Sequence, residues 1–104
     1  MSSYIQISGT PRTPWAEEAL TVDGTLRHPD ATKTAGSLMA RARLQGGPIR
    51  IQMLTAPTST VGTPLYDADV VEWAFPELAA LVATGGLILD SAGATATLWI
   101  VFYR

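Results

Sequence analysis

Alternation of apolar and polar side chains is the dominant pattern of this chain, and it predicts β-strands. Over 37–44, Ala and Leu alternate with Met39, Arg41 and Arg43. After the turn-forming residues 46–48 the alternation resumes over 49–54, with Arg50 on the polar side. The pattern therefore predicts a β-hairpin that carries Arg41, Arg43 and Arg50 on one solvent-exposed face. A helix over 31–45 is the competing interpretation, but Gly36 inside it would cost about 1 kcal/mol.

The C-terminal residues form a second predicted hairpin with an unusual last strand. Its arms are 86–89 and 94–103, joined by a turn at 91–93. From Leu98 onward both faces of the last strand are apolar, whereas a half-exposed antiparallel strand alternates. We therefore expect both faces of this strand to be covered, either by a helix of the same domain or by another chain.

The N-terminal third contains a predicted strand, a loop and an ambiguous segment. Residues 4–8 alternate and predict a strand, and the two prolines of 9–14 indicate a loop. Thr13 followed by Pro14 suits the start of a helical turn over 15–20. Further on, Asp23-Gly24 lies between short apolar runs, which favours a hairpin with a type I′ turn. We expect the hairpin from Ala19 onward and leave a helical turn before it open.

Between the two main hairpins the sequence predicts a loop, a strand and a short helix. Residues 55–64 are uncharged and rich in Thr and Pro, which indicates a long loop. The strand is expected within 65–73 and the helix over 76–83, between Pro76 and the glycine pair 85–86. The buried stripe of that helix would consist of Leu78, Leu81 and Val82.

These elements together predict the fold class. Many short strands with closely spaced turn signals, and one or two short helices, indicate a small antiparallel β-sandwich or barrel. With 104 residues, the chain has the length of one domain, and we expect a single β-rich domain over 1–104.

Composition narrows the function classes. Hydrophobic residues make up 47% of the chain and charged residues only 15%, against about 25% in an average domain. This high apolar content argues against an intrinsically disordered chain. A net charge of −2 disfavours a nucleic-acid partner, and the lack of Cys excludes a disulfide scaffold.

The apolar stretches 78–89 and 91–103 are shorter than the roughly 18 residues of a membrane helix. Residues 1–8 lack the basic and apolar regions of a signal peptide, so we expect no membrane partner.

Candidate catalytic and metal-binding residues are few. His28 is the only histidine, and no Gly-x-Ser-x-Gly motif accompanies it, so we interpret it as a structural or exposed loop residue. Asp67, Asp69 and Glu72 form the densest acidic group. Such a group can be a solvated loop, an intermolecular ion pair, a Ca²⁺ or Mg²⁺ site or a glycosidase pair, and we favour the first two. We therefore expect a non-enzymatic protein without cofactor or metal.

Aromatic and basic side chains are instead the candidates for a protein interface. Trp and Tyr serve as core residues, sugar platforms or interface anchors, and Arg is enriched with them in interfaces. Trp99 and Tyr103 lie on the second apolar face of the last strand, and Arg41, Arg43 and Arg50 suit the carboxylates of a neighbour. The candidate interface residues are Trp99, Val101, Tyr103, Trp73, Phe75, Arg41, Arg43 and Arg50.

In size, low Cys content and abundance of Ala, Thr and Gly, the chain resembles the capsid decoration (cement) proteins of tailed bacteriophages. That resemblance implies a β-rich structural component of a virion, assembled in the host cytoplasm. Its partners would be copies of itself, a major capsid protein, or both. The alternative hypothesis is a small carbohydrate- or ligand-binding β-sandwich module, and without a virion the expected location is the cytoplasm.

Overall fold

The fold is built around two long strands that pair with each other from end to end. The computed structural model describes residues 6–7, 10–11 and 13–104. Strand β4 runs antiparallel to β7, from the pair Met39 and Tyr103 to the pair Gln52 and Gly86. The elements in chain order are β1 (Gln6–Ile7), β2 (Thr10–Pro11), β3 (Pro14–Val22), α1 (Ala31–Ala35), β4 (Met39–Gln52), β5 (Thr63–Leu65), β6 (Val70–Ala74), α2 (Phe75–Ala83) and β7 (Gly86–Tyr103).

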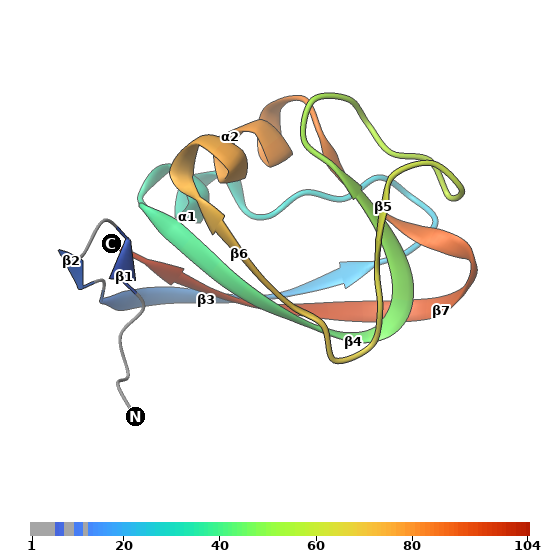
Figure 1. Ribbon diagram of the computed structural model, residues 1–104, viewed down its shortest axis with the longest axis horizontal. Helices are drawn as coiled ribbons and strands as arrows, with labels where there is room; N and C mark the ends of the chain where they lie inside the picture. The colour runs from blue at the N-terminus through green and yellow to red at the C-terminus, as the bar shows by residue number, and fades with distance from the viewer. Residues whose placement is uncertain (1–5, 8–9, 12) are drawn as a thin grey trace.

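Both long strands bend at their middle, so that the sheet curls back over itself (Figure 1). On β4 the bend lies at Gly46 and Gly47, whose φ angles of 88° and 92° favour glycine. On β7 the adjacent glycine is Gly93, which packs against Pro48, and a Cβ atom there would lie 2.7 Å from the Pro48 carbonyl oxygen. The register shifts at both sides of Gly47 mark this place as a bulged bend.

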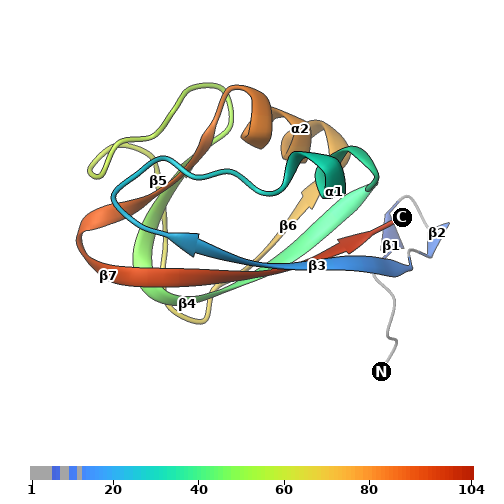
Figure 2. The same ribbon diagram turned by 180° about the vertical axis from the view of Figure 1, so that it is seen from behind.

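The other strands extend this ladder at its two edges. Strand β3 pairs with the second half of β7, while β5 and β6 pair with the two halves of β4 on its far edge. After β3 the chain follows β7 around the bend, as the bridge between Arg27 and Leu87 shows. The result is one strongly bent antiparallel sheet with two short helices over its inner side (Figure 2). The predicted fold class, a small antiparallel β-sandwich or barrel, is confirmed.

The core lies inside the bend, beneath α2. Leu78 and Leu81 of α2 are fully buried and belong to one hydrophobic cluster with inner side chains of β7, among them Leu98 and Phe102. The N-terminus of α2 is closed by Glu77, whose carboxylate accepts the backbone N–H of Ala74. The predicted helix is thus confirmed with a start one residue earlier, although Val82 is only half-buried.

Three predicted local structures are wrong. The hairpins expected over 37–54 and 86–103 are the two long strands, and their centres at 46–48 and 91–93 are bends rather than reversals. The hairpin at Asp23-Gly24 does not form, because β3 pairs with β7 instead. The common cause is that Gly and Pro mark a change of direction but not its size.

The ambiguous segments are also settled. Residues 15–20 belong to strand β3, and the helical alternative for 31–45 survives as the five-residue α1 alone. The strand expected over 65–73 divides into β5 and β6 around a loop at 66–69. Of the strand expected over 4–8, Gln6–Ile7 is β1, and Tyr4, Ile5 and Ser8 lie outside the described residues.

Candidate functional site

The outer face of the sheet, turned away from both helices, carries an ordered set of side chains. Because neighbouring strands are in register, residues line up in rows across β3, β7, β4 and β6. One row consists of Glu17, Val101, Arg41 and Glu72. The next row consists of Ala19, Trp99, Arg43 and Val70. A third row across β3, β7 and β4 consists of Thr21, Thr97 and Gln45. We call these three rows the outer face.

Trp99 is the most prominent apolar side chain of the outer face. Its exposed fraction is 51%, although its neighbours Leu98 and Ile100 on the same strand are buried. The indole N–H donates to the Gln45 side-chain oxygen at 2.9 Å, which draws the ring toward β4. Tryptophan combines an apolar ring with a polar N–H and is for that reason enriched at surfaces that bind another molecule.

Three hollows lined by described residues border the ring, and two of them lie on its two sides over the outer face. The hollow on the β4 side has a volume of about 260 Å³ and is bordered by Arg41, Arg43 and Val70. The hollow on the β3 side has a volume of about 190 Å³ and is bordered by Glu17, Ala19 and Val101. The Trp99 ring therefore projects between two depressions, and a side chain of another molecule fits into either of them.

The charges of the outer face are not used within the described part of the chain. Its two ion pairs join Arg27 to Asp23 and Arg50 to Asp90, and neither involves Arg41, Arg43 or Glu17. Arg41 and Arg43 are exposed side chains beside an exposed tryptophan. Trp and Arg together are the residues most enriched at the centres of protein interfaces.

No family model, curated protein or solved structure matches this chain. The outer face is thus assigned from its own geometry. Four of the predicted interface residues lie on it: Trp99, Val101, Arg41 and Arg43.

The other four predicted interface residues lie elsewhere. Trp73 is 4% exposed and belongs to the core, because it sits on the inner side of β6. Tyr103 is 8% exposed at the end of β7, where it pairs with the buried Met39. Phe75 is exposed at the first position of α2, outside the three rows. Neither Trp73 nor Tyr103 is thus available as an exposed anchor.

Arg50 does not join Arg41 and Arg43 in one patch, contrary to the prediction. It lies beyond the bend of β4, where its Nε donates to the Asp90 carboxylate at 2.6 Å and its Nη1 to the Gly62 carbonyl at 3.1 Å. The backbone N–H of Ala92 and the guanidinium of Arg50 together hold the pKa of Asp90 below its ordinary value. Arg50 therefore stabilises the bend rather than offering a free charge.

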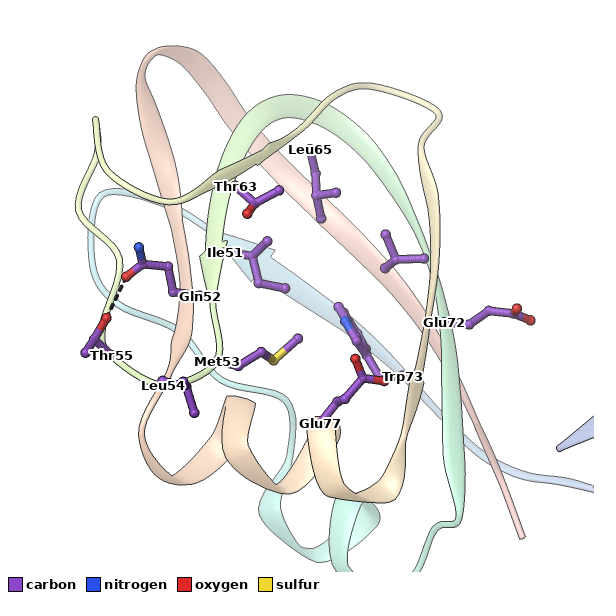
Figure 3. A pocket seen from close by; sticks show the side chains of 11 residues that line it. Ile51, Gln52, Met53, Leu54, Thr55, Thr63, Leu65, Glu72, Trp73 and Glu77 are labelled. Carbon is purple, nitrogen blue, oxygen red and sulfur yellow. Dashed lines mark hydrogen bonds between the residues drawn. The ribbon is translucent and has the colours of Figure 1, made fainter. Parts of the chain in front are cut away.

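A second concave surface opens at the inner edge of the bent sheet (Figure 3). This groove has a volume of about 590 Å³, and its wall includes Ile51, Met53, Leu65, Val71 and Trp73. Glu77 extends into it beside Trp73, whereas Glu72 points away from it. The groove is mainly apolar and falls in the size range of small-molecule sites.

Three of the four residues considered for catalysis or metal binding have structural partners, and the fourth, Glu72, lies on the outer face. The Nδ1 atom of His28 lies 3.0 Å from the Leu81 carbonyl oxygen. Asp67 accepts the N–H of Gly46 and so fastens the loop 66–69 to the bend, whereas Asp69 accepts the N–H of Tyr66 and closes the loop on itself. Within the residues described, no three His, Cys, Asp or Glu side chains gather as metal ligands would. None of the described helices has the length and apolarity to cross a bilayer.

The outer-face residues that sequence reasoning did not identify as interface candidates include Glu17, Ala19 and Val70. Glu17 and Ala19 lie in the segment whose secondary structure was ambiguous, so their face was not assigned. Val70 was assigned to a strand without a partner. The available signal was the alternation of 16–22, in which Ala16, Glu18, Leu20 and Val22 form the inner set.

Proposed function

We propose that this chain is a non-enzymatic assembly protein that acts through protein–protein contacts made by its outer face. The observation that carries the proposal is Trp99, which is 51% exposed between two hollows and next to the exposed Arg41 and Arg43. In an isolated domain such a ring is hydrated at a cost, and a partner that covers it gains about 25 cal/mol per Å² of apolar surface.

The composition supports the same proposal. Charged residues are only 15% of the chain, which suits surfaces that become buried in an assembly. In this respect the chain resembles capsid decoration proteins of tailed phages, and we propose a virion as the assembly. The partner would be a second copy, a major capsid protein, or both.

Binding to capsid shells tests this function. Undecorated shells are assembled from the major capsid protein encoded in the same genome and are sedimented with increasing amounts of the chain. Saturable binding that Trp99→Ala weakens at least tenfold supports the proposal. The matched control is Leu54→Ala, since Leu54 is 82% exposed in a loop away from the outer face. No binding by the native chain, or equal binding by Trp99→Ala, contradicts the proposal.

The groove favours a second candidate function, the binding of a small apolar ligand. Its wall is apolar and Glu77 supplies one acceptor, a combination common in ligand sites. Because Trp73 is buried, it offers no open ring face for sugar stacking, so the carbohydrate alternative loses support here. Val71→Trp would fill the groove. If the native chain enhances the fluorescence of the apolar dye anilinonaphthalene sulfonate and Val71→Trp does not, the groove is a ligand site. Equal fluorescence from both proteins contradicts it.

A further inference from the structure

The charges of the outer face are arranged with opposite signs on the two sides of β7. In the first row Glu17 on β3 and Arg41 on β4 are equivalent neighbours of Val101. In the second row Ala19 and Arg43 are equivalent neighbours of Trp99, so a small side chain is opposed to a large one. If β3 and β4 exchange places, the acidic and the basic residue of the first row therefore exchange places as well. The small and the large residue of the second row do the same.

A two-fold axis parallel to β7 makes that exchange when two sheets are stacked face to face. It keeps each row at its own height along the strands, and it lays β4 of one copy over β3 of the other. The partner's Arg41 then lies over Glu17, and the partner's Glu17 over Arg41. Arg43 likewise lies over the partner's Ala19, so no second charged or large side chain opposes it there. We propose that the outer face binds a second copy of this chain in this arrangement, which rests on the proposed function and names its partner.

Other two-fold arrangements of the same face are disfavoured. An axis perpendicular to the strands keeps β4 over β4 and inverts the rows, which brings Arg41 of one copy onto Arg43 of the other. An axis shifted to the gap between β7 and β4 lays β3 over β6, so that Glu17 meets the partner's Glu72. Like charges directly opposed in an interface are unfavourable, so the axis over β7 is the arrangement the charges select.

The tilt of Trp99 suits the same arrangement. Its hydrogen bond to Gln45 draws the ring toward β4, which leaves the hollow of about 190 Å³ beside Ala19 open. The partner's Trp99 is drawn toward its own β4, and that strand lies over β3. The two rings therefore pass each other on opposite sides of the axis instead of colliding, and each faces the partner's open hollow.

The size of the face sets the expected affinity. Three rows across three strands cover roughly 300 Å² per copy at the usual strand and residue spacings. That is small beside the roughly 800 Å² per partner of a standard stable interface. The isolated dimer is therefore expected to be weak and to form at high micromolar concentration, and an assembly that holds many copies close together would populate it fully.

Charge reversal at Glu17 and Arg41 tests the inference, with sedimentation of the free chain from about 10 µM to 1 mM as the measurement. Glu17→Arg and Arg41→Glu, each alone, are expected to weaken dimerisation at least tenfold, because each places two like-charged pairs in the interface. Within one chain the two residues are separated by β7, and neither takes part in an ion pair with another described residue. Glu72→Gln is the matched control, since Glu72 lies in the same row but outside the overlap, and it is expected to leave the dimer unchanged.

The decisive measurement is the mixture of the two reversed variants. A dimer of one Glu17→Arg chain and one Arg41→Glu chain restores two opposite-charged pairs, so the mixture is expected to dimerise within about threefold of the native chain. A native chain that stays monomeric at 1 mM, or a mixture that does not recover, overturns the inference. Shell binding that still depends on Trp99 would in that case leave the proposed function standing. A dimer that fails to bind shells would instead contradict the virion function alone.

Discussion

Gly47 on β4 lies opposite Ala94 on β7, at the point where both long strands bend. The two bends coincide because neither strand can turn alone without losing its partner. The backbone of Pro48 packs closely against Gly93 there, with the Pro48 nitrogen 3.0 Å from where a Cβ would stand. The outer face depends on this bend, because it divides Arg41 and Arg43 from Arg50.

Gly93→Ala is expected to destabilise the protein by about 1–3 kcal/mol. The added Cβ meets the Pro48 backbone, and a backbone atom cannot move aside as a flexible side chain can. Urea unfolding gives the free energy. Gly24→Ala is the control, since no atom lies within 4 Å of a Cβ at that exposed position, and its effect should stay within about 0.5 kcal/mol. Equal effects of the two changes would argue against close packing at the bend.

The same bend explains what the sequence could and could not predict. Alternation located the strand segments, because burial on one face of a strand leaves a local signal. Whether Gly46-Gly47 reverses the chain or only bends it depends on the pairing with β7, some fifty residues away, and no local signal reports that pairing. Trp99 and Arg41 were found as interface candidates from their own strands, but their relation to Glu17 required the register of three strands.

The two faces of β7 are expected to respond differently to truncation. Phe102 is fully buried, so Phe102→Ala should cost about 3–5 kcal/mol of unfolding free energy. Trp99→Ala on the outer face should cost less than about 1 kcal/mol in the monomer, where it loses only an exposed hydrogen bond and partial packing. Both values come from urea unfolding at a few micromolar protein. A Trp99→Ala cost as large as that of Phe102→Ala would place the ring in the core.

Asp23 is expected to titrate with a pKa of about 2, below the ordinary value of 3.8. The largest cause is the hydrogen bond and ion pair with Arg27, at 2.7 Å, followed by the N–H of Thr25. Because the folded state holds this pKa low, its stabilising effect is present above pH 4 and is lost as pH falls through about 2. Arg27→Gln should raise the pKa only part of the way, since Thr25 still donates. Carboxyl titration by NMR measures both, and an unchanged pKa in Arg27→Gln would contradict the assignment.

Asp90 and Arg50 are expected to be energetically coupled at neutral pH and uncoupled in acid. Asp90 accepts from Ala92 and Arg50, and these contacts lower its pKa below 3.8. The contribution of the carboxylate is therefore complete above that value and disappears as pH falls through the lower folded pKa. Asp90→Asn keeps an acceptor for Ala92 and removes the charge, while Arg50→Gln removes the partner.

A double-mutant cycle by urea unfolding at pH 7 should give a favourable coupling between the two residues. The same cycle at a pH below the folded pKa of Asp90 should give less coupling, because the protonated Asp90 no longer pairs with the guanidinium. Additive effects at pH 7, or a coupling that persists undiminished in acid, would show that the ion pair does not hold the bend.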